Sequence, residues 1–322
     1  MRNILIFLFL TIITYSCITD YDLDLKSSQS RMVVEGLITN QKGPYLIRLT
    51  KSKDRLTLYP IQYSSNGDTS YNYRYPNGVK ESIQDAEVFI TDKNTSVTDT
   101  LIKSPEGEWH YYEGGNNFPV WKRFEVGDTS IINGFYQTTK IKGIPGHTYA
   151  LTIKWQNQEY HAESYMPEVP PIDSVQFNFT KGAVGKTDYN IPLLFFKEPQ
   201  NERNYYLFIT TESRAWPYSI LSDEYLNDYV NGLDVCKGVS PDYWLTSYPD
   251  VFDGHLSMDY FIEMHSMTKE GYEYYKALIQ QFRTDGGGYS PSPASPPTNL
   301  DNGALGFFRA SAVNRVDFKS TN

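Results

Sequence analysis

Residues 145–165 read PGHTYALTIKWQNQEYHAESY, and this stretch carries the clearest secondary-structure signal of the chain. After the turn residues Pro145-Gly146, apolar and polar residues alternate along two short runs. Alternation with a period of two is typical of a strand that has one face in a core. We therefore expect two strands here, Tyr149–Lys154 and Glu159–Tyr165, as part of a β fold.

Similar short runs fill the first half of the chain. Five further candidate strands are Met32–Thr39, Tyr45–Thr50, Ala86–Thr91, Thr98–Ile102 and Gln137–Lys140. Turn residues such as Asn40-Gln41-Lys42-Gly43-Pro44 separate them. Short strands with regular turns and no helical period predict an immunoglobulin- or transthyretin-like β-sandwich over residues 31–166.

Composition agrees with a mostly β globular protein and excludes some function classes. The chain has 322 residues, of which 40% are hydrophobic, 21% charged and 15% aromatic. Aromatic residues favour strands, and this balance is unlike that of a disordered chain. The net charge of −9 and the lack of a basic stripe argue against a nucleic-acid binder. The cysteines, Cys17 and Cys236, are too few for a disulfide framework or a four-ligand zinc site.

Residues 1–16 have the pattern of a secretory signal peptide. The apolar run Ile4–Ile13 is too short to span a bilayer, and Cys17 stands where cleavage is expected. We expect Cys17 to carry the lipid anchor of a bacterial lipoprotein, followed by an acidic tether over residues 17–30. The alternative is an ordinary signal peptide with an incidental cysteine. The acidic residues of the tether are Asp20, Asp22 and Asp24.

A second β-rich domain is expected over residues 172–322, after prolines that mark a rigid boundary. The boundary prolines are Pro167, Pro170 and Pro171. The candidate strands of this domain are Ser174–Thr180, Ile191–Lys197, Asn204–Thr211, His255–His265 and Ala304–Ala312. Residues 214–254 show no regular pattern, so we expect a long irregular insertion there.

One helix is predicted over residues 266–283 of the second domain. Ser266 or Thr268 can cap its first turn. Its apolar stripe consists of Tyr275, Leu278, Ile279 and Phe282. The helix ends before three consecutive glycines, which disfavour its continuation.

Two aromatic-rich insertions, residues 55–79 and 107–136, interrupt the sandwich and are expected to be loops. Tyr and Trp supply a large contact area with few rotatable bonds, so such loops suit a binding surface. The candidate contact residues are Tyr59, Tyr63, Tyr71, Tyr73, Trp109, Tyr111, Tyr112 and Trp121. The alternative is that the loops cover a sheet edge or pack on the second domain.

No motif for catalysis, a cofactor or a metal is present. The sequence has no nucleophile elbow, phosphate-binding glycine loop or clustered metal-ligand spacing. Glu263 and His265 share one strand face, which we expect to be solvated. Cys236 is most simply a small buried residue. Asp99-Thr100-Leu101 and Asp173-Ser174-Val175 resemble a bacterial O-glycosylation pattern, so Thr100 and Ser174 are candidate modification sites.

A series of sequence blocks resembles the Bacteroidota lipoprotein family called domain of unknown function 4249. The N-terminal blocks are VVEGLIT at 33–39, GPYLIRL at 43–49, the residues Ala86, Val88 and Ile90, GIPGHTYALTI at 143–153 and VPPIDS at 169–174. The C-terminal blocks are YEYYKAL at 272–278, PPTN at 296–299 and GALGFFRAS at 303–311. Together they cover nearly the whole chain in order.

The resemblance implies an outer-membrane lipoprotein exposed at the cell surface that acts beside a TonB-dependent receptor. It supplies no catalytic residue, cofactor or ligand, so a non-enzymatic role in ligand capture or uptake is expected by association. A structural subunit for adhesion or envelope assembly is the alternative. The two differ in whether the aromatic insertions converge on a concave site.

Overall fold

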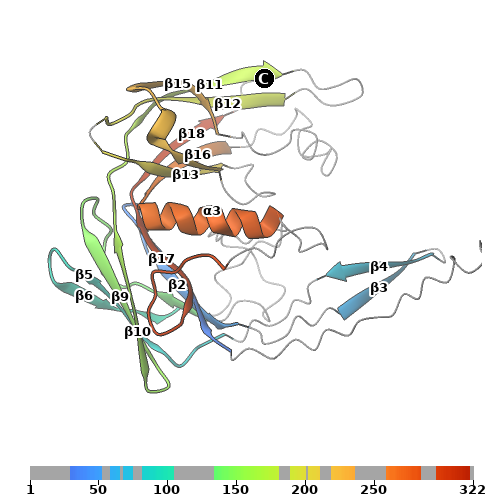
Figure 1. Ribbon diagram of the computed structural model, residues 1–322, viewed down its shortest axis with the longest axis vertical. Coiled ribbons are helices and arrows are strands. Elements are labelled where there is room, and N and C mark those ends of the chain that lie inside the picture. Colours follow the sequence, from blue (N-terminus) through green and yellow to red (C-terminus); the bar gives the residue numbers. More distant parts are fainter. Residues whose placement is uncertain are drawn as a thin grey trace, which may run out of the picture.

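The computed structural model describes residues 30–52, 59–65, 68–74, 82–104, 134–180, 189–200, 202–210, 219–235, 259–283 and 295–319. In these ranges the chain is mostly β, with several sheets and one α-helix, α3 (Lys269–Arg283). A β-sandwich is followed by a second β-rich part that carries α3 (Figure 1). The predicted fold class is therefore confirmed.

Two sheets form the sandwich, one of order β17-β1-β2-β8-β7 and one of order β10-β9-β5-β6. Apolar side chains from both, including Val34, Ile47, Leu151 and Phe308, form one buried core between them. The strands are β1 (Met32–Thr39), β2 (Leu46–Lys51), β5 (Glu87–Asp92), β6 (Val97–Thr100), β7 (Ile102–Lys103), β8 (Phe135–Gln137), β9 (Thr148–Trp155), β10 (Gln158–Tyr165) and β17 (Leu305–Ser311).

The hairpin β9–β10 follows the alternation of its sequence. Buried and partly exposed residues alternate along β9, and buried and exposed residues alternate along most of β10. Trp155 pairs with Gln158, and the two residues between them, Gln156 and Asn157, have positive φ of 49° and 59°. This is the backbone that a two-residue hairpin requires, and asparagine tolerates it well. The local sequence therefore sets this part of the fold.

The stretch Thr98–Ile102, predicted as one strand, is divided between two sheets. The chain passes from β6 to β7 at Leu101, which is buried in the core. Beside this crossing, Asp99 is fully buried and accepts hydrogen bonds from the N–H groups of Thr139, Lys140 and Ile141 at 2.8 to 2.9 Å. Burial alone would raise the pKa of Asp99, but these bonds hold it below its usual range.

The strand β17 joins the sandwich although it lies near the end of the chain. It pairs with β1 in parallel, from Val33 opposite Leu305 to Thr39 opposite Ser311. The predicted domains, residues 31–166 and 172–322, assign this strand to the second domain. The structure places it in the sandwich, in the same sheet as β1. Alternation shows which face of a strand is buried, but it does not show which distant strand pairs with it.

Glycines of the family-like blocks allow this parallel contact. A Cβ atom at Gly306 would lie 2.0 Å from the carbonyl oxygen of Val34, and the φ of Gly306 is +91°. A Cβ atom at Gly36 would lie 2.9 Å from a ring carbon of Phe308. Only glycine fits at such distances without displacing its neighbours.

Asn299 closes the sandwich between β10 and β17. Its side-chain amide donates to the carbonyl oxygen of Phe308 at 2.7 Å and accepts from the N–H of Phe308 at 3.0 Å, as a strand residue would. The same amide donates to the carbonyl oxygen of Glu163 at 3.0 Å, and Leu300 forms a bridge with Ala162. The PPTN block is therefore structural, because it joins the two sheets at this side.

The second part contains one sheet of order β11-β12-β15 and one of order β14-β13-β16-β18. Its elements are β11 (Ile172–Thr180), β12 (Tyr189–Lys197), β13 (Tyr205–Thr210), β14 (Ser219–Ser222), the 3-10 helix η1 (Asp223–Tyr225), β15 (Tyr229–Asp234), β16 (Asp259–Met267) and β18 (Val313–Lys319). A separate core includes Phe196, Tyr206, Ile262 and Met264. Since β14 and β15 fall within 214–254, that region is less irregular than expected.

Helix α3 begins just after Thr268, one of the two predicted caps. The Thr268 side chain accepts a hydrogen bond from the N–H of Gly271 at 3.2 Å. Ser266, the other candidate, is instead part of β16 and is buried. In the described part of the chain, no helix is both long and apolar enough to cross a membrane.

The substitution Gly306→Ala is expected to lower the free energy of unfolding by about 3 kcal/mol or more, because the new Cβ would overlap the backbone of β1. Gly303→Ala is the matched control, since Gly303 also has a positive φ, of +75°, but nothing lies within 4 Å of its added Cβ. That change should cost about 1 kcal/mol. Urea unfolding measures both, and equal losses would contradict the role given to the β1–β17 contact.

Candidate functional site

The candidate residues from the sequence are only partly within the described chain. Cys17, Cys236, Trp109, Tyr111, Tyr112 and Trp121 lie outside the described residues. Thr100 and Ser174 are exposed, on β6 and β11, which is compatible with modification. The neighbouring Asp99 is a buried hydrogen-bond acceptor, so it has a structural role of its own.

The four remaining tyrosines lie on an antiparallel ribbon rather than on a loop. Its strands β3 (Tyr59–Ser65) and β4 (Asp68–Arg74) form a two-stranded sheet, drawn apart from the other sheets in Figure 1. Ser65 pairs with Asp68, and the sequence between them is Asn66-Gly67, the dipeptide that most favours a two-residue hairpin. That dipeptide is the signal by which the ribbon could have been predicted.

The register divides the four tyrosine positions between the two faces of the ribbon. Pro60 lies opposite Tyr73 and Gln62 lies opposite Tyr71, while Tyr59 and Tyr63 occupy the alternate positions of β3. Successive positions of a strand alternate between faces, and directly opposed positions share a face. Positions 59 and 63 are therefore on one face, and positions 71 and 73 are on the other. The four tyrosine positions therefore do not share one face of the ribbon.

A group of linked polar side chains lies where the two parts meet. Figure 1 shows α3 between the sheet of β13, β16 and β18 and the strand β17. On one side Tyr272 packs on Tyr205, with ring centroids 5.0 Å apart. On the other side Tyr274 stacks on Phe307 at 4.9 Å. We call the residues around α3 at this contact the seam.

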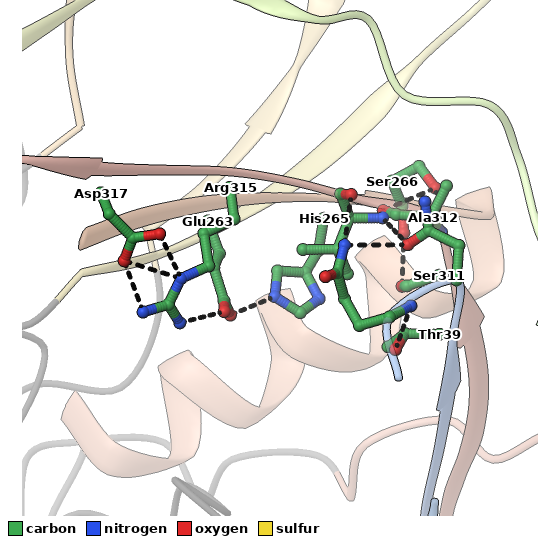
Figure 2. Close-up of polar contacts among 11 residues, drawn as sticks. Thr39, Glu263, His265, Ser266, Ser311, Ala312, Arg315 and Asp317 are labelled. Atoms are coloured by element: carbon green, nitrogen blue, oxygen red, sulfur yellow. Dashed lines mark hydrogen bonds and ion pairs between the residues drawn. The ribbon is translucent and has the colours of Figure 1, made fainter. Parts of the chain in front are cut away.

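A row of charged side chains crosses the seam beside α3. Figure 2 shows Asp317, Arg315, Glu263 and His265 in sequence, from β18 to β16. Arg315 donates to Asp317 at 2.7 Å and to Glu263 at 2.9 Å, and the other Glu263 oxygen lies 3.0 Å from Nε2 of His265. The exposed fraction of the side chain falls from 64% at Asp317 to 4% at His265. The row therefore leads from the surface to a buried end.

Burial and the ion pairs shift the pKa values in opposite ways along the row. Burial alone would raise the pKa of Glu263, but His265 and Arg315 outweigh it and hold that pKa low. Burial lowers the pKa of His265, against the effect of Glu263, and the nearby Arg309 lowers it further. Neutral His265 beside ionised Glu263 is thus the favoured state. The expectation that this strand face is solvated was wrong, because α3 covers it.

Two buried arginines continue the polar seam across the outer face of the sandwich sheet. Arg48 lies 3.5 Å from Glu35, its direct neighbour on β1. Arg309 is 5% exposed, and its guanidinium carbon lies 5.2 Å from the ring centroid of Tyr275 on α3. Within the described residues, Nε and Nη1 of Arg309 have no hydrogen-bond partner. The helix therefore contacts a cationic patch of the sandwich through aromatic rings.

The seam contains a histidine–carboxylate pair, and the hydrogen bonds around it are made within the protein. His265 has a carboxylate partner, as catalytic histidines often do, but the hydroxyl groups near it are engaged elsewhere. Ser266 donates to the carbonyl oxygen of Pro167 at 2.6 Å, and Ser311 donates to that of Ser266 at 2.5 Å. In the described ranges, no group of three or more His, Cys, Asp or Glu residues could hold a metal ion.

Comparison with known proteins gives one family. A family model described as domain of unknown function (DUF4249) matches residues 18–316, which includes both parts of the fold. A search of curated proteins gives no match.

Glu263 in the seam can be compared with Glu198, a buried glutamate outside the seam whose pKa is shifted in the opposite direction. Glu198 is 1% exposed and accepts hydrogen bonds from the hydroxyl of Tyr206 at 2.8 Å and the amide of Asn204 at 3.0 Å. Burial raises its pKa despite these bonds, with a smaller contribution from Asp223. The pKa of Glu263 is lowered, so its stabilisation is present above the unfolded-state pKa of about 4.3 and is lost as the pH falls. For Glu198 the stabilisation is present at low pH and is lost as the pH rises.

We therefore expect Glu263→Gln to lower the free energy of unfolding at pH 7 by about 2 kcal/mol, because two charge-assisted bonds are weakened. Glu198→Gln is expected to leave the free energy of unfolding unchanged or raise it, because a buried carboxyl group that resists ionisation is replaced by a neutral amide. Urea unfolding between pH 4 and pH 8 measures both variants. Equal destabilisation by the two substitutions at pH 7 would show that the opposite pKa directions are wrong.

Proposed function

Since the chain belongs to the family described as domain of unknown function DUF4249, we propose that it is a non-enzymatic lipoprotein of the outer-membrane surface. In this proposal it is an accessory of a TonB-dependent receptor and assists in ligand capture or uptake. Family membership gives no chemistry, so the proposal rests on the leader sequence and on the described parts of the fold.

The N-terminal sequence, residues 1–17, is the main support for this proposal. Ile4–Ile13 is an apolar run of signal-peptide length, and it ends just before Ser16-Cys17. Each buried CH₂ of an acyl chain contributes about 0.8 kcal/mol, so several chains on Cys17 would hold the protein at a membrane without a spanning helix. The acidic residues Asp20, Asp22 and Asp24 follow at once, as in surface-exposed lipoproteins of the Bacteroidota.

The fold supports binding more than catalysis. Two described carboxylates whose pKa is lowered, Asp99 and Glu263, each accept several hydrogen bonds from the protein itself. A group used in this way holds strands together and is not presented to a substrate. The ribbon β3–β4, in contrast, lies apart from the sheets and suits contact with another molecule.

The alternative is an adhesion or envelope-assembly subunit without a small ligand. The observation that favours it is the division of the tyrosine positions between both faces of the ribbon. Aromatic positions on both faces of a ribbon suit contact with a protein better than enclosure of a small molecule.

The substitution Cys17→Ser is expected to release the full-length protein from the outer membrane. The wild-type protein should sediment with that membrane and dissolve only in detergent, whereas the variant should be at least about tenfold more abundant in the soluble fraction. Cys236→Ser is the matched control and should remain bound. Membrane fractionation with immunoblotting measures all three proteins, and membrane-bound Cys17→Ser would exclude the lipid anchor at this residue.

Purification of the lipidated protein from native membranes through a tag after Asn322 is expected to recover a β-barrel receptor. The Cys17→Ser variant should recover it at least about tenfold less, because an unanchored protein does not share the membrane with the receptor. Mass spectrometry of the eluates identifies the partner. Recovery of only surface or assembly proteins from the anchored form would favour the structural alternative.

A further inference from the structure

Among the described residues, the ribbon β3–β4 is a sheet of only two strands, fewer than most β-sheets contain. Its strands pair along their whole length, from Tyr59 opposite Arg74 to Ser65 opposite Asp68. In the described part of the chain neither strand pairs with a third one. A lone two-stranded ribbon is marginally stable in water, and three or more strands are usually needed. A third strand on one edge of the ribbon would therefore stabilise it.

The two outer edges of the ribbon are not equivalent. Pro60 in β3 has no N–H, so its nitrogen belongs on the side away from β4, and it blocks the outer edge of β3. Pro60 lies opposite Tyr73, which places the N–H and C=O groups of Tyr73 on the outer edge of β4. By alternation the same holds for Thr69 and Tyr71. The sequence of β4 contains no proline or lysine to protect that edge.

The sequence of β4 is complementary to itself in the antiparallel direction. The strand reads DTSYNYR, with Tyr71 at its centre, Asp68 at one end and Arg74 at the other. When two copies align about Tyr71, each Asp68 lies opposite Arg74 of the second copy. Opposite charges at directly opposed positions stabilise a strand pair. In the same alignment Thr69 lies opposite Tyr73, so the outward-facing positions meet one another.

We propose that β4 is a homodimerisation edge, through which two copies of the chain form a continuous four-stranded sheet of order β3-β4-β4-β3. The two-fold axis passes through Tyr71. The outward positions 69, 71 and 73 supply about six main-chain hydrogen bonds, and the Asp68–Arg74 pairs fix the register. The contact uses no residue of the seam and does not depend on the lipid anchor, so it is separate from the function proposed above.

Disulfide trapping in cells that express the full-length chain tests the register. Tyr71→Cys and Tyr73→Cys are each combined with Cys236→Ser, and Cys17 is left in place. In the proposed pair the Cα atoms of the two copies of residue 71 are about 5.5 Å apart, within disulfide range. The two copies of residue 73 are about 13 Å apart, too far for a bond. Electrophoresis without reductant should show at least about tenfold more covalent dimer for Tyr71→Cys than for Tyr73→Cys.

Every other result of this experiment overturns the proposal. No covalent dimer from either variant would show that the β4 edges do not meet. Equal yields would show random collision instead of a defined register. A cross-link from residue 71 to a different protein would show that the edge accepts a strand of another partner, and mass spectrometry of the band distinguishes this case.

Exchanging the charges of Asp68 and Arg74 distinguishes a loss of strand pairing between copies from a loss of folding. Arg74→Asp and Asp68→Arg alone should each raise the dissociation constant of the dimer about tenfold, because each creates two like-charge contacts in the symmetric pair. The double variant restores both pairs and should return to within about threefold of the wild type. Sedimentation of the detergent-purified full-length protein measures the constant. A double variant as weak as the single variants would overturn the proposed register.

Discussion

The parallel contact between β17 and β1 is the constraint on which the rest of this structure depends. It places β1 between β2 and β17, so that both of its edges are paired. The contact is close because Gly306 has no side chain where the carbonyl of Val34 approaches. The cost of closing a long connection grows only slowly with its length, so a distant strand can complete the sheet. Most of the second part of the protein, from β11 to α3, lies between β10 and β17 in the chain, and β18 returns to it after β17.

The continuation of the chain after β17 ties the two parts together. Ala312 is fully buried and connects β17 in the sandwich sheet with β18 in the second part. Ser266 of β16 binds the backbone of Ala312 in both directions, accepting from its N–H at 3.0 Å and donating its own N–H to its carbonyl oxygen at 2.9 Å. The outer faces of the two sheets must then meet across α3. Glu263 is largely covered at this contact, with 19% of its side chain exposed, and its pairing with Arg315 offsets the cost of burying a charge.

Much of the fold could be predicted from local patterns, and most of the rest depends on contacts between distant segments. Alternation identified β9 and β10, and one of the two predicted caps, Thr268, marks the start of α3, whereas the predicted start at Ser266 is three residues early. The same alternation correctly placed Glu263 and His265 on one strand face but not under a helix, because the cover comes from another element. The pairing of β17 with β1 was missed for the same reason. The ribbon was predicted as a loop because residues 55–79 are rich in Asn, Ser, Gly and Pro, although Asn66-Gly67 within them favours a two-residue hairpin.

The candidate site could also be predicted only in part. The shifted pKa values, in particular, could not be predicted from the sequence. Shifted pKa values often mark active sites, and the described residues include several carboxyl groups with such shifts, among them Asp99 and Glu198. Each described case has a structural cause, such as the three backbone N–H groups on Asp99 or the hydroxyl and amide on Glu198. These shifts therefore report how strands are held and give no reason to assign a reaction. Within the described residues, β4 is a strand paired along one edge only, and its sequence and register are the basis of the dimer proposed above.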